Sequence, residues 1–405
     1  MNAILLVTGV TVVLALLFDF TNGFHDAANA TSTVIATRSL KPRTAVIMSA
    51  IFNFLPAFVV GTAVANTISK TVKLDSLPVV AAGDVPLGVR MTLAALVGAV
   101  FWNFLTWALG LPSSSSHALI GGLIGAGLSA GGAAVINWDA VSKTAVAIVA
   151  SPAVAFGIAF LVMWIIRLLL RRFKFSEDSE FFRWGQVVSS AWVSWGHGSN
   201  DAQKTMGIIA ATLYTGGFMT AANASSLAPP IWVIFAAQAA IAAGTMWGGW
   251  RIIQTMGLRI TRITRASGFA ANLGAISGIE GATRLGIPIS TTQAVSASIV
   301  GSGVGARRAV NWRVMRDMVI AWLITLPAAG LIGFVVFKLT VLPGIAAVIA
   351  TTLVILALLI WAGRMMLNAM TAKDIEAELP SVEELKSPNY GLQVAQVPDT
   401  GHDAA

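Results

Sequence analysis

Residues 22–31 read NGFHDAANAT and residues 196–205 read GHGSNDAQKT, so a short polar stretch with Gly, Asn and Asp occurs twice in this chain. A proline with a cluster of hydroxyl residues follows each copy, LPSSSSH at 111–117 and IPISTTQ at 287–293. The aspartate of each stretch precedes the proline of its cluster by 86 residues in the first copy and by 87 in the second. Duplicated polar breaks in a hydrophobic chain are typical of secondary transporters, whose binding site lies between two repeats.

The composition indicates a protein that crosses a membrane many times. Of the 405 residues, 56% are hydrophobic and 11% are charged, whereas soluble domains carry about 25% charged residues. The chain has no cysteine, which excludes disulfides and thiolate metal sites. The net charge of +8 is spread over short loops, which favours orientation in a bilayer over nucleic-acid binding. The first hydrophobic segment lacks a basic leader, so we expect a retained span and not a signal peptide.

Eleven hydrophobic segments are expected, five in each repeat and one after them. They are 3–36, 43–66, 87–110, 113–131, 141–170, 186–212, 231–251, 266–286, 288–306, 317–339 and 346–369. The corresponding domains are the first transmembrane repeat (1–173), a cytoplasmic linker (174–183), the second, inverted transmembrane repeat (184–345), an additional span (346–370) and a mobile cytoplasmic tail with a short helical start (371–405).

Loop charge predicts how these segments lie in the membrane. Lys and Arg gather in the loops 38–43, 167–174, 259–265 and 307–316, whereas 131–140 and 213–230 have none. The positive-inside rule places the four basic loops in the cytoplasm. A basic loop in one copy matches an uncharged loop in the other, and each copy has five segments, so the second copy enters the membrane upside down. The amino terminus is then outside the cell membrane and the carboxyl tail is cytoplasmic.

The expected fold is therefore an all-α polytopic membrane protein, an inverted-repeat transporter with discontinuous helices and one extra C-terminal span. One pair of segments in each copy has two interpretations. Segments 87–110 and 113–131 either cross the bilayer twice or form a re-entrant hairpin. The linker 111–116 has no Lys or Arg, which favours a hairpin whose tip turns inside the protein. The second tip, at 287–293, would then enter from the opposite face.

Two aspartates are the first candidates for function. Asp26 and Asp201 are equivalent in the two copies, and a carboxylate inside a membrane costs about 3 kcal/mol unless it is paired. Each lies among Gly, Ala and Asn, where a helix can open and expose carbonyls to a cation. The expected cation-coupling residues are Asp26, Asn29, Asn200, Asp201 and Lys204, and Na⁺ could bind at the two aspartates. The alternative is a structural hydrogen-bond network between helices.

The hydroxyl clusters are candidates for anion binding. In each copy the proline ends one helix and the following residues can cap the next. A capped helix start offers free N–H groups and positive dipole charge to an anion. The expected substrate-binding residues are Ser114, Ser115, Ser116, Ser290, Thr291, Thr292 and Gln293. The alternative is simple capping, with close helix contacts through small residues nearby.

Three of the four histidines, His25, His117 and His197, lie in these motifs. Neutral histidine is tolerated there and can relay protons, although a packed, hydrogen-bonded histidine is the more common case. No spacing in the chain resembles a catalytic metal site or a nucleophile triad. We therefore expect no enzymatic activity.

These motifs resemble those of the inorganic phosphate transporter (PiT) family, in the form found in its bacterial low-affinity members. The similarity covers residues 10–340 and rests on four motifs in order. It implies symport of inorganic phosphate with Na⁺ or H⁺, in which the two aspartates couple the cation and the hydroxyls cradle the phosphate. The chain departs from the family at Asn272, where many members have Glu, and at Gln293, where His is common.

Lys204 distinguishes the second copy from the first. It follows Asp201 by three residues, where the first copy has Asn29 after Asp26. If Asn29 helps to ligate a cation, the Lys204 ammonium can substitute for one. We hypothesise that the second copy carries a built-in cation and that coupling uses protons at Asp26. The alternative is that Lys204 snorkels to the membrane surface or pairs with Asp201.

The sequence thus predicts a secondary active symporter of phosphate, with H⁺ slightly preferred over Na⁺ and no cofactor besides that ion. The first alternative is a sulfate or other oxyanion permease on the same fold, followed by an anion channel and by an intramembrane enzyme such as a lipid phosphatase. The expected partners are the lipid bilayer and phosphate, either free or as a divalent-metal complex. No nucleic acid is expected, and a homodimer is compatible with the sequence.

Overall fold

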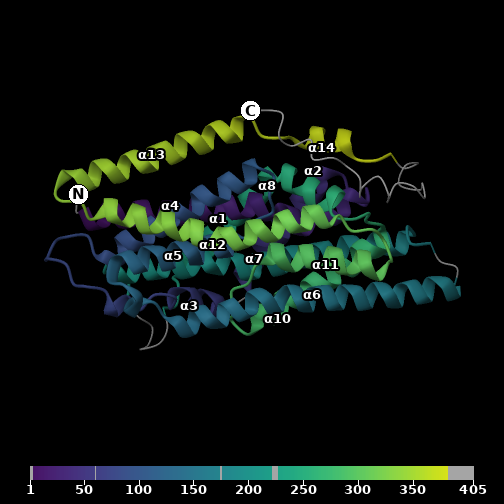
Figure 1. Ribbon diagram of the computed structural model, residues 1–405, viewed down its shortest axis with the longest axis horizontal. Coiled ribbons are helices and arrows are strands. Elements are labelled where there is room, and N and C mark those ends of the chain that lie inside the picture. Colours follow the sequence, from purple (N-terminus) through teal and green to yellow (C-terminus); the bar gives the residue numbers. More distant parts are fainter. Residues whose placement is uncertain (1–2, 60, 174–175, 221–226, 382–405) are drawn as a thin grey trace.

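The computed structural model describes residues 3–59, 61–173, 176–220 and 227–381, and helices dominate it (Figure 1). The first copy contains α1 (Ala3–Ala36), α2 (Pro42–Phe54), α3 (Ala63–Ser69), α4 (Leu87–Ala108), α5 (Ser115–Gly131) and α6 (Trp138–Phe173). The second copy contains α7 (Glu180–Thr215), α8 (Ile231–Trp247), α9 (Trp250–Gln254), α10 (Arg265–Arg284), α11 (Thr291–Gly305) and α12 (Trp312–Thr340). α13 (Ile345–Leu367) and α14 (Ala372–Glu378) follow. Each expected segment coincides with one helix or one bent group of helices.

The second segment of each copy is bent. In the first copy α2 is followed by a 3-10 turn (Leu55–Phe58) and then by α3. In the second copy α8 is followed by α9 and a π-helical turn (Thr255–Arg259), and the chain bends by 67° between α8 and these turns. The discontinuous helices that the sequence predicts therefore lie in these two segments.

Five of the described helices are long and apolar enough to cross a bilayer, or seven if each bent pair is one span. α5 has 17 residues and α11 has 15, which at about 1.5 Å per residue gives about 26 and 22 Å against a hydrocarbon core of about 30 Å. By length and composition alone, fewer of the described segments than the eleven expected therefore qualify as full membrane spans. The short, glycine-rich arms of the hairpins are buried in protein, where they need less hydrophobic surface than a span that faces lipid.

The two copies interlock, and each packs on the other in the same way. The hairpin α4–α5 packs on α12 of the second copy, and the hairpin α10–α11 packs on α6 of the first. In the same manner α1 contacts α8, and α7 contacts α2. α13 lies along one edge of the bundle, where it packs on α12 and α4 (Figure 1). Neither copy can bury its apolar faces without the other.

The equivalent helices α1 and α7 lie antiparallel at the centre of the molecule. Asn22 donates from its Nδ2 to Asp201 Oδ2 at 3.2 Å, and Thr37, further along α1, donates to Gln186 Oε1, earlier on α7, at 2.9 Å. Residue numbers therefore rise along one helix as they fall along the other. Antiparallel equivalents are the arrangement that an inverted repeat requires.

The motif helices do not open, which contradicts our expectation for 22–31 and 196–205. α1 and α7 run without a break through both stretches. The glycines serve close packing instead, because a Cβ at Gly23 would lie 2.1 Å from the Ile241 carbonyl oxygen and one at Gly198 would lie 2.3 Å from the Asn53 carbonyl oxygen. Each glycine lets its helix approach the bent segment of the opposite copy.

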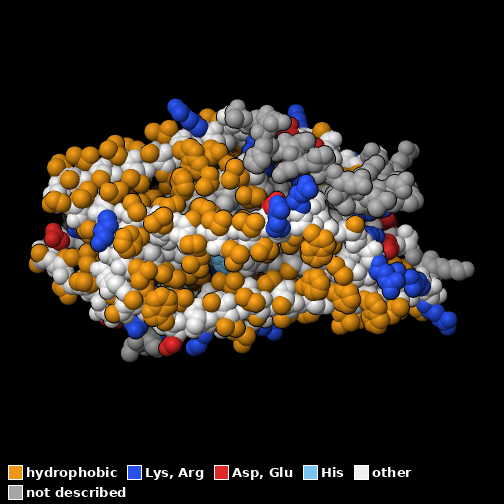
Figure 2. Space-filling model, viewed as in Figure 1, with side chains coloured by type: hydrophobic (Ala, Val, Ile, Leu, Met, Phe, Trp, Pro, Cys, Tyr) orange, Lys and Arg blue, Asp and Glu red, His pale blue; other side chains and the backbone are white. Residues whose placement is uncertain are grey.

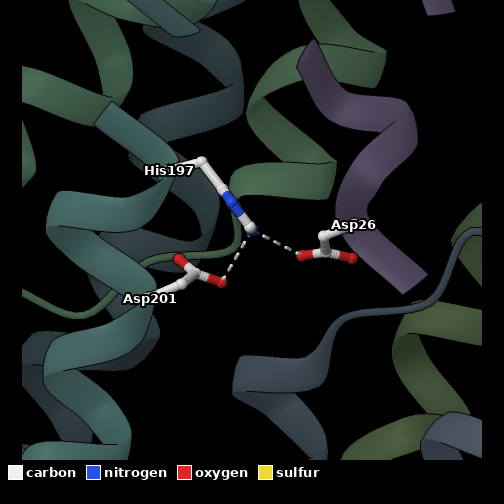
Figure 3. A group of neighbouring side chains, drawn as sticks. All are labelled: Asp26, His197 and Asp201. Atoms are coloured by element: carbon white, nitrogen blue, oxygen red, sulfur yellow. Dashed lines mark ion pairs between the residues drawn. The ribbon is translucent and has the colours of Figure 1, made fainter. Parts of the chain in front are cut away.

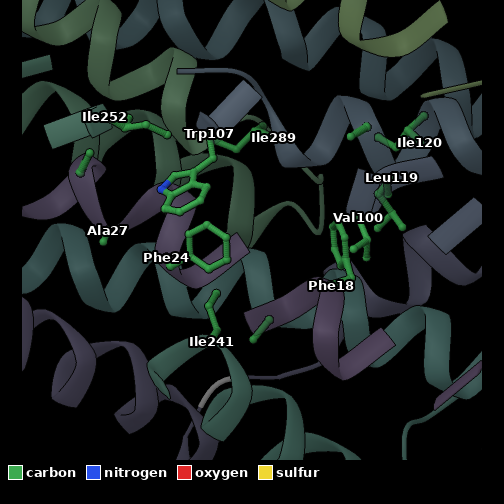
Figure 4. Close-up of a cluster of buried hydrophobic side chains, with 14 of the residues drawn as sticks. Phe18, Phe24, Ala27, Val100, Trp107, Leu119, Ile120, Ile241, Ile252 and Ile289 are labelled. Carbon is green, nitrogen blue, oxygen red and sulfur yellow. The ribbon is translucent and has the colours of Figure 1, made fainter. Parts of the chain in front are cut away.

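Aromatic and aliphatic side chains pack beside the first motif. Phe24 lies next to Trp107 of α4, with their ring centroids 5.0 Å apart, and Ile241 of α8 is drawn on the other side of the Phe24 ring (Figure 4). The face of the molecule drawn in Figure 2 is mainly apolar, and basic side chains gather at the end where α6 finishes with Arg171 and Arg172. An apolar belt with basic ends is typical of a multi-pass membrane protein.

The predicted helical start of the tail is α14. Its Ile375 is 1% exposed, and α14 packs on α2 and α9. Arg38, in the loop after α1, donates to the carbonyl oxygens of Leu379 and Pro380 at 3.0 and 2.8 Å. The tail is thus attached to the helical bundle up to this point, and residues 382–405 lie outside the described part of the chain.

Candidate functional site

The two hairpin tips are built alike. Ser114 is the N-cap of α5 and accepts a hydrogen bond from the backbone N–H of His117 at 3.2 Å. Ser290 is the N-cap of α11 and accepts one from the backbone N–H of Gln293 at 3.3 Å. The predicted capping is therefore confirmed in both copies, and the hydroxyls that follow each cap are left to point into the protein.

The two predicted aspartates lie on either side of one histidine (Figure 3). His197 Nε2 is 3.7 Å from Asp26 Oδ2 and 3.7 Å from Asp201 Oδ2. One ligand atom of each of the three residues lies within 4.8 Å of the others, which is close enough to hold a small cation. All three side chains are at most 2% exposed. Carboxylates from both copies therefore meet at one buried point.

Asp26 is held by the hydroxyls of the second hairpin tip. Thr291 donates to Asp26 Oδ2 at 3.2 Å, and Thr292 donates to Asp26 Oδ1 at 3.0 Å. His25 Nδ1 lies 2.8 Å from Asp26 Oδ1. Asn29 donates to both threonine hydroxyls at 3.2 Å. The second tip therefore surrounds the Asp26 carboxylate with hydroxyl groups, and His25 contacts the same carboxylate from within the first copy.

Asp201 is held by an ammonium. Lys204 Nζ donates to Asp201 Oδ1 at 2.7 Å, to Ser116 Oγ at 2.5 Å and to the carbonyl oxygen of Ile289 at 3.0 Å. Its side chain is fully buried, so it pairs with Asp201 and does not snorkel. Ser115 completes this side by donating to Asn22 Oδ1 at 2.7 Å.

The three predicted relay histidines occupy different surroundings. His25 Nε2 lies 3.3 Å from Ser113 Oγ, so this ring connects Asp26 to the first tip. His197 lies between the carboxylates. His117 is placed apart from them, with its Nδ1 3.3 Å from the carbonyl oxygen of Trp322 on α12.

Two other predicted residues do not reach the carboxylates. Asn200 braces the second tip, because its Nδ2 donates to Thr283 Oγ1 at 2.9 Å and its Oδ1 accepts from the backbone N–H of Ile289 at 3.4 Å. The Gln293 side chain has an Oε1 with no partner among the described residues. Asn272, at the position where many family members have Glu, links α10 to α7 by donating to Ser189 Oγ at 3.0 Å.

The sequence reasoning missed three residues that the structure places at or near this site. Asn22 bridges Ser115 and Asp201, and Asn53 Oδ1 lies 3.1 Å from His197 Nδ1. Asp19, on α1, is a third buried carboxylate besides Asp26 and Asp201. Asn22 could have been found because it is the repeat equivalent of His197, and Asp19 because it is an acidic residue inside an apolar run.

The chain has extensive similarity to known transporters. A family model described as the phosphate transporter family matches residues 22–333. A probable low-affinity inorganic phosphate transporter of Rhizobium meliloti (strain 1021) is 45% identical over 327 residues, which cover 80% of this chain and 93% of that protein. A protein of the same name from Bacillus subtilis (strain 168) is 41% identical over 338 residues, 83% of this chain and 98% of that protein. These relatives are named as transporters and not as enzymes, in agreement with the motifs.

A solved structure is also similar. It is described as the sodium-dependent phosphate transporter, and the two chains superpose with a TM-score of 0.68 at 23% sequence identity. The match covers 82% of this chain and 98% of that chain. This likeness shows that the two proteins share a fold.

Proposed function

Because the chain belongs to the phosphate transporter family, we propose that it is a symporter that carries inorganic phosphate across the cell membrane together with protons. The observation that carries this proposal is the meeting of both aspartates, His197 and both hydroxyl tips at one buried point. Carboxylates for a cation and hydroxyls for an anion, drawn from both copies, are the groups that coupled transport between repeats requires.

His197 supports protons as the coupled ion. Asn53 Nδ2 donates to Thr245 Oγ1 at 2.7 Å, so the Asn53 oxygen faces His197 and the proton of the neutral ring lies on its Nδ1. The lone pair of Nε2 then faces two carboxylates, which is repulsive unless a cation lies between them. A second ring proton at Nε2 satisfies both carboxylates at once. Na⁺, a hard cation like Ca²⁺ and Mg²⁺, suits a set made of oxygen atoms better than one that includes a ring nitrogen.

The hydroxyls of Ser115, Ser116, Thr291 and Thr292 are the groups that would receive the anion. In the closed structure they bond to Asn22, to Asn29, to Asp26 and to Lys204, which are polar partners that an incoming phosphate can displace. Asn29 also presents an Oδ1 with no partner among the described residues. A protonated phosphate can donate a hydrogen bond to such an acceptor and sulfate cannot, which favours phosphate over sulfate.

Transport requires the site to open alternately to each face. The side chains of the carboxylate cluster are at most 2% exposed, so the site is closed on both sides in this structure. We infer that the hairpins α4–α5 and α10–α11 are re-entrant from opposite faces and that access alternates as these units move against α6 and α12. Binding of anion and cation together lowers the cost of each charge in the low-dielectric centre. Loop charge supports an outside amino terminus and a cytoplasmic tail.

Lys204 supports a single exchangeable cation at the cluster. Its ammonium already neutralises Asp201 and reaches the first tip, where it can also attract phosphate. Asp26 has no lysine or arginine within ion-pair distance among the described residues and lies beside His25 and His197. Coupling at this cluster therefore runs through Asp26 and the two histidines.

The test is uptake of radiolabelled phosphate into proteoliposomes, with a pH gradient or a Na⁺ gradient imposed separately and sulfate present as competitor. We expect accumulation with the pH gradient alone, little competition by sulfate, and loss of accumulation in Asp26→Asn. Accumulation driven only by Na⁺ would refute proton coupling. Concentrative uptake of sulfate in place of phosphate would refute the substrate assignment, and uptake that never exceeds equilibrium would indicate a channel.

A further inference from the structure

Asp19 is a buried carboxylate for which the coupling scheme has no use. Its side chain is 0% exposed within α1, and neither of its oxygens has a hydrogen-bond partner among the described residues. An isolated ionised carboxylate is too costly in an apolar interior, so the group must be neutralised by a proton or another cation. A structural carboxylate would instead be expected to hold hydrogen bonds.

The position of Asp19 relates it to the cluster. It precedes Asp26 by seven residues, which is two helical turns, so it lies on the same face of α1 about 10 Å towards the start of the helix. The Thr205 hydroxyl faces it from α7, one turn after Asp201. Asp19 and Thr205 therefore form a separate layer beside the carboxylate cluster, between the same two helices.

The polar groups around Asp19 form no hydrogen bond with it among the described residues. Thr205 is 0% exposed, and its Oγ1 also has no hydrogen-bond partner in the described chain. The Asn22 amide faces the carboxylate but donates to Asp201. The charged groups that face this layer are Asp201 and Lys204, which pair with each other. A buried carboxylate and a neighbouring hydroxyl, each without a hydrogen-bond partner in the described chain, suit a small cation with oxygen ligands.

The balance of buried charges at the centre of the molecule also favours a cation at Asp19. Asp19, Asp26 and Asp201 are the three acidic residues with buried side chains in the described chain, and Lys204 is the one buried lysine or arginine. Two negative charges thus remain before any phosphate enters. A cation at Asp26 neutralises one of them, and the other is at Asp19.

We propose that Asp19 and Thr205 form a second site for the co-transported cation, distinct from the Asp26–His197–Asp201 cluster. This inference rests on the proposed symport and adds a second coupled ion to it. Each phosphate is then carried with one cation at each site. A proton and Na⁺ both suit the oxygen ligands, so the experiment uses both.

The test is the steady-state accumulation of phosphate in proteoliposomes under a tenfold pH gradient or a tenfold Na⁺ gradient, with the membrane potential clamped at zero. Each coupled ion multiplies accumulation by the ratio of its concentrations across the membrane, so Asp19→Asn should lower accumulation about tenfold under the gradient that drives the wild type. Exchange of internal for external phosphate should continue, because asparagine is neutral like the cation-loaded carboxylate. Unchanged accumulation would overturn the second site, and so would loss of both accumulation and exchange with the protein inserted.

A matched pair of threonines on α7 controls for packing. Thr205→Val removes the unpartnered hydroxyl and should raise the cation concentration for half-maximal uptake roughly tenfold. Thr212 lies two turns further along α7, and its buried hydroxyl donates to the carbonyl oxygen of Ile208. Thr212→Val should therefore leave the cation concentration for half-maximal uptake unchanged. Equal effects of the two variants would contradict the proposal. If the wild type itself shows no concentrative uptake, that result refutes the proposed symport as a whole, whereas a failure confined to the variants refutes the second site.

Discussion

The two copies of the motif make the same contact with different chemistry. Asn29 donates to Thr292 of the opposite hairpin tip at 3.2 Å. Lys204, at the equivalent position in the second copy, donates to Ser116 of the other tip at 2.5 Å. A neutral amide thus occupies one position and an ammonium the other. The duplicated fold is thus chemically asymmetric at this pair of residues.

This asymmetry explains why the two aspartates have different partners. Asp26 accepts from hydroxyls and lies beside His25, whereas Asp201 accepts from Lys204. A carboxylate that already holds a lysine at 2.7 Å has little need of a mobile cation. Under the proposed function, the exchangeable cation of the cluster belongs to the first copy, and the second copy contributes a fixed one.

The largest expected effect is that of Asp26→Asn, which removes the carboxylate that has no ammonium partner. The variant should lose all concentrative phosphate uptake, because no proton can be exchanged at the cluster, and it should keep its thermal stability. Asparagine retains an acceptor for the Thr292 hydroxyl, which now donates at 3.0 Å. Uptake in proteoliposomes and thermal unfolding in detergent measure the two properties. Full accumulation by this variant would contradict the assignment of coupling to the first copy.

The matching change in the second copy, Asp201→Asn, should differ by also destabilising the fold. It leaves the Lys204 ammonium buried without its counter-charge, which costs about 3–5 kcal/mol in comparable proteins. The thermal unfolding temperature should fall, and the double variant Asp201→Asn with Lys204→Met should recover much of the loss. Equal stability of Asp26→Asn and Asp201→Asn would show that the two carboxylates are not in different electrostatic states.

The hydroxyl tips provide a smaller contrast. Thr291→Val and Ser115→Ala each remove one hydroxyl that we assign to phosphate, so each should raise the phosphate concentration for half-maximal uptake roughly tenfold. Thr291→Val should also weaken proton coupling, because Thr291 donates to Asp26 at 3.2 Å, whereas Ser115 donates to Asn22. The pH dependence of uptake separates these effects. A shift of the pH profile in Ser115→Ala alone would reverse the proposed roles.

The smallest effects are expected where the two copies are alike. Ser114→Ala and Ser290→Ala each remove one helix cap, which should cost about 1 kcal/mol of stability. The two losses should be equal within error in thermal unfolding. A much larger loss of transport than of stability in either variant would indicate that its hydroxyl also contacts the substrate.

The sequence predicted those parts of the molecule that follow from local pattern. Hydropathy and the duplicated motif placed the helices and both copies, and the Ser114 and Ser290 caps follow from a proline and a hydroxyl at a helix start. The prediction that α1 and α7 open was wrong, because glycine has two uses and only the approach of Ile241 to Gly23 shows which one applies.

The contacts across the repeats could not be derived from local pattern. The position of His197 between Asp26 and Asp201 depends on how closely two antiparallel helices approach. Asn22 and Asn53 also act through partners that are far away in the chain. Asp19 was visible in the sequence as an acidic residue, but its lack of partners is a property of the packed structure alone.

The measurement that tests the fixed-cation account most directly is phosphate uptake by Lys204→Asn in proteoliposomes with a Na⁺ gradient at equal pH. This change gives the second copy the residue of the first, so Asp201 should then need a mobile cation. The account predicts that the variant gains a stimulation of uptake by Na⁺ that exceeds any stimulation in the wild type. Uptake by an inserted variant that gains no Na⁺ dependence would contradict the claim that Lys204 replaces a transported cation.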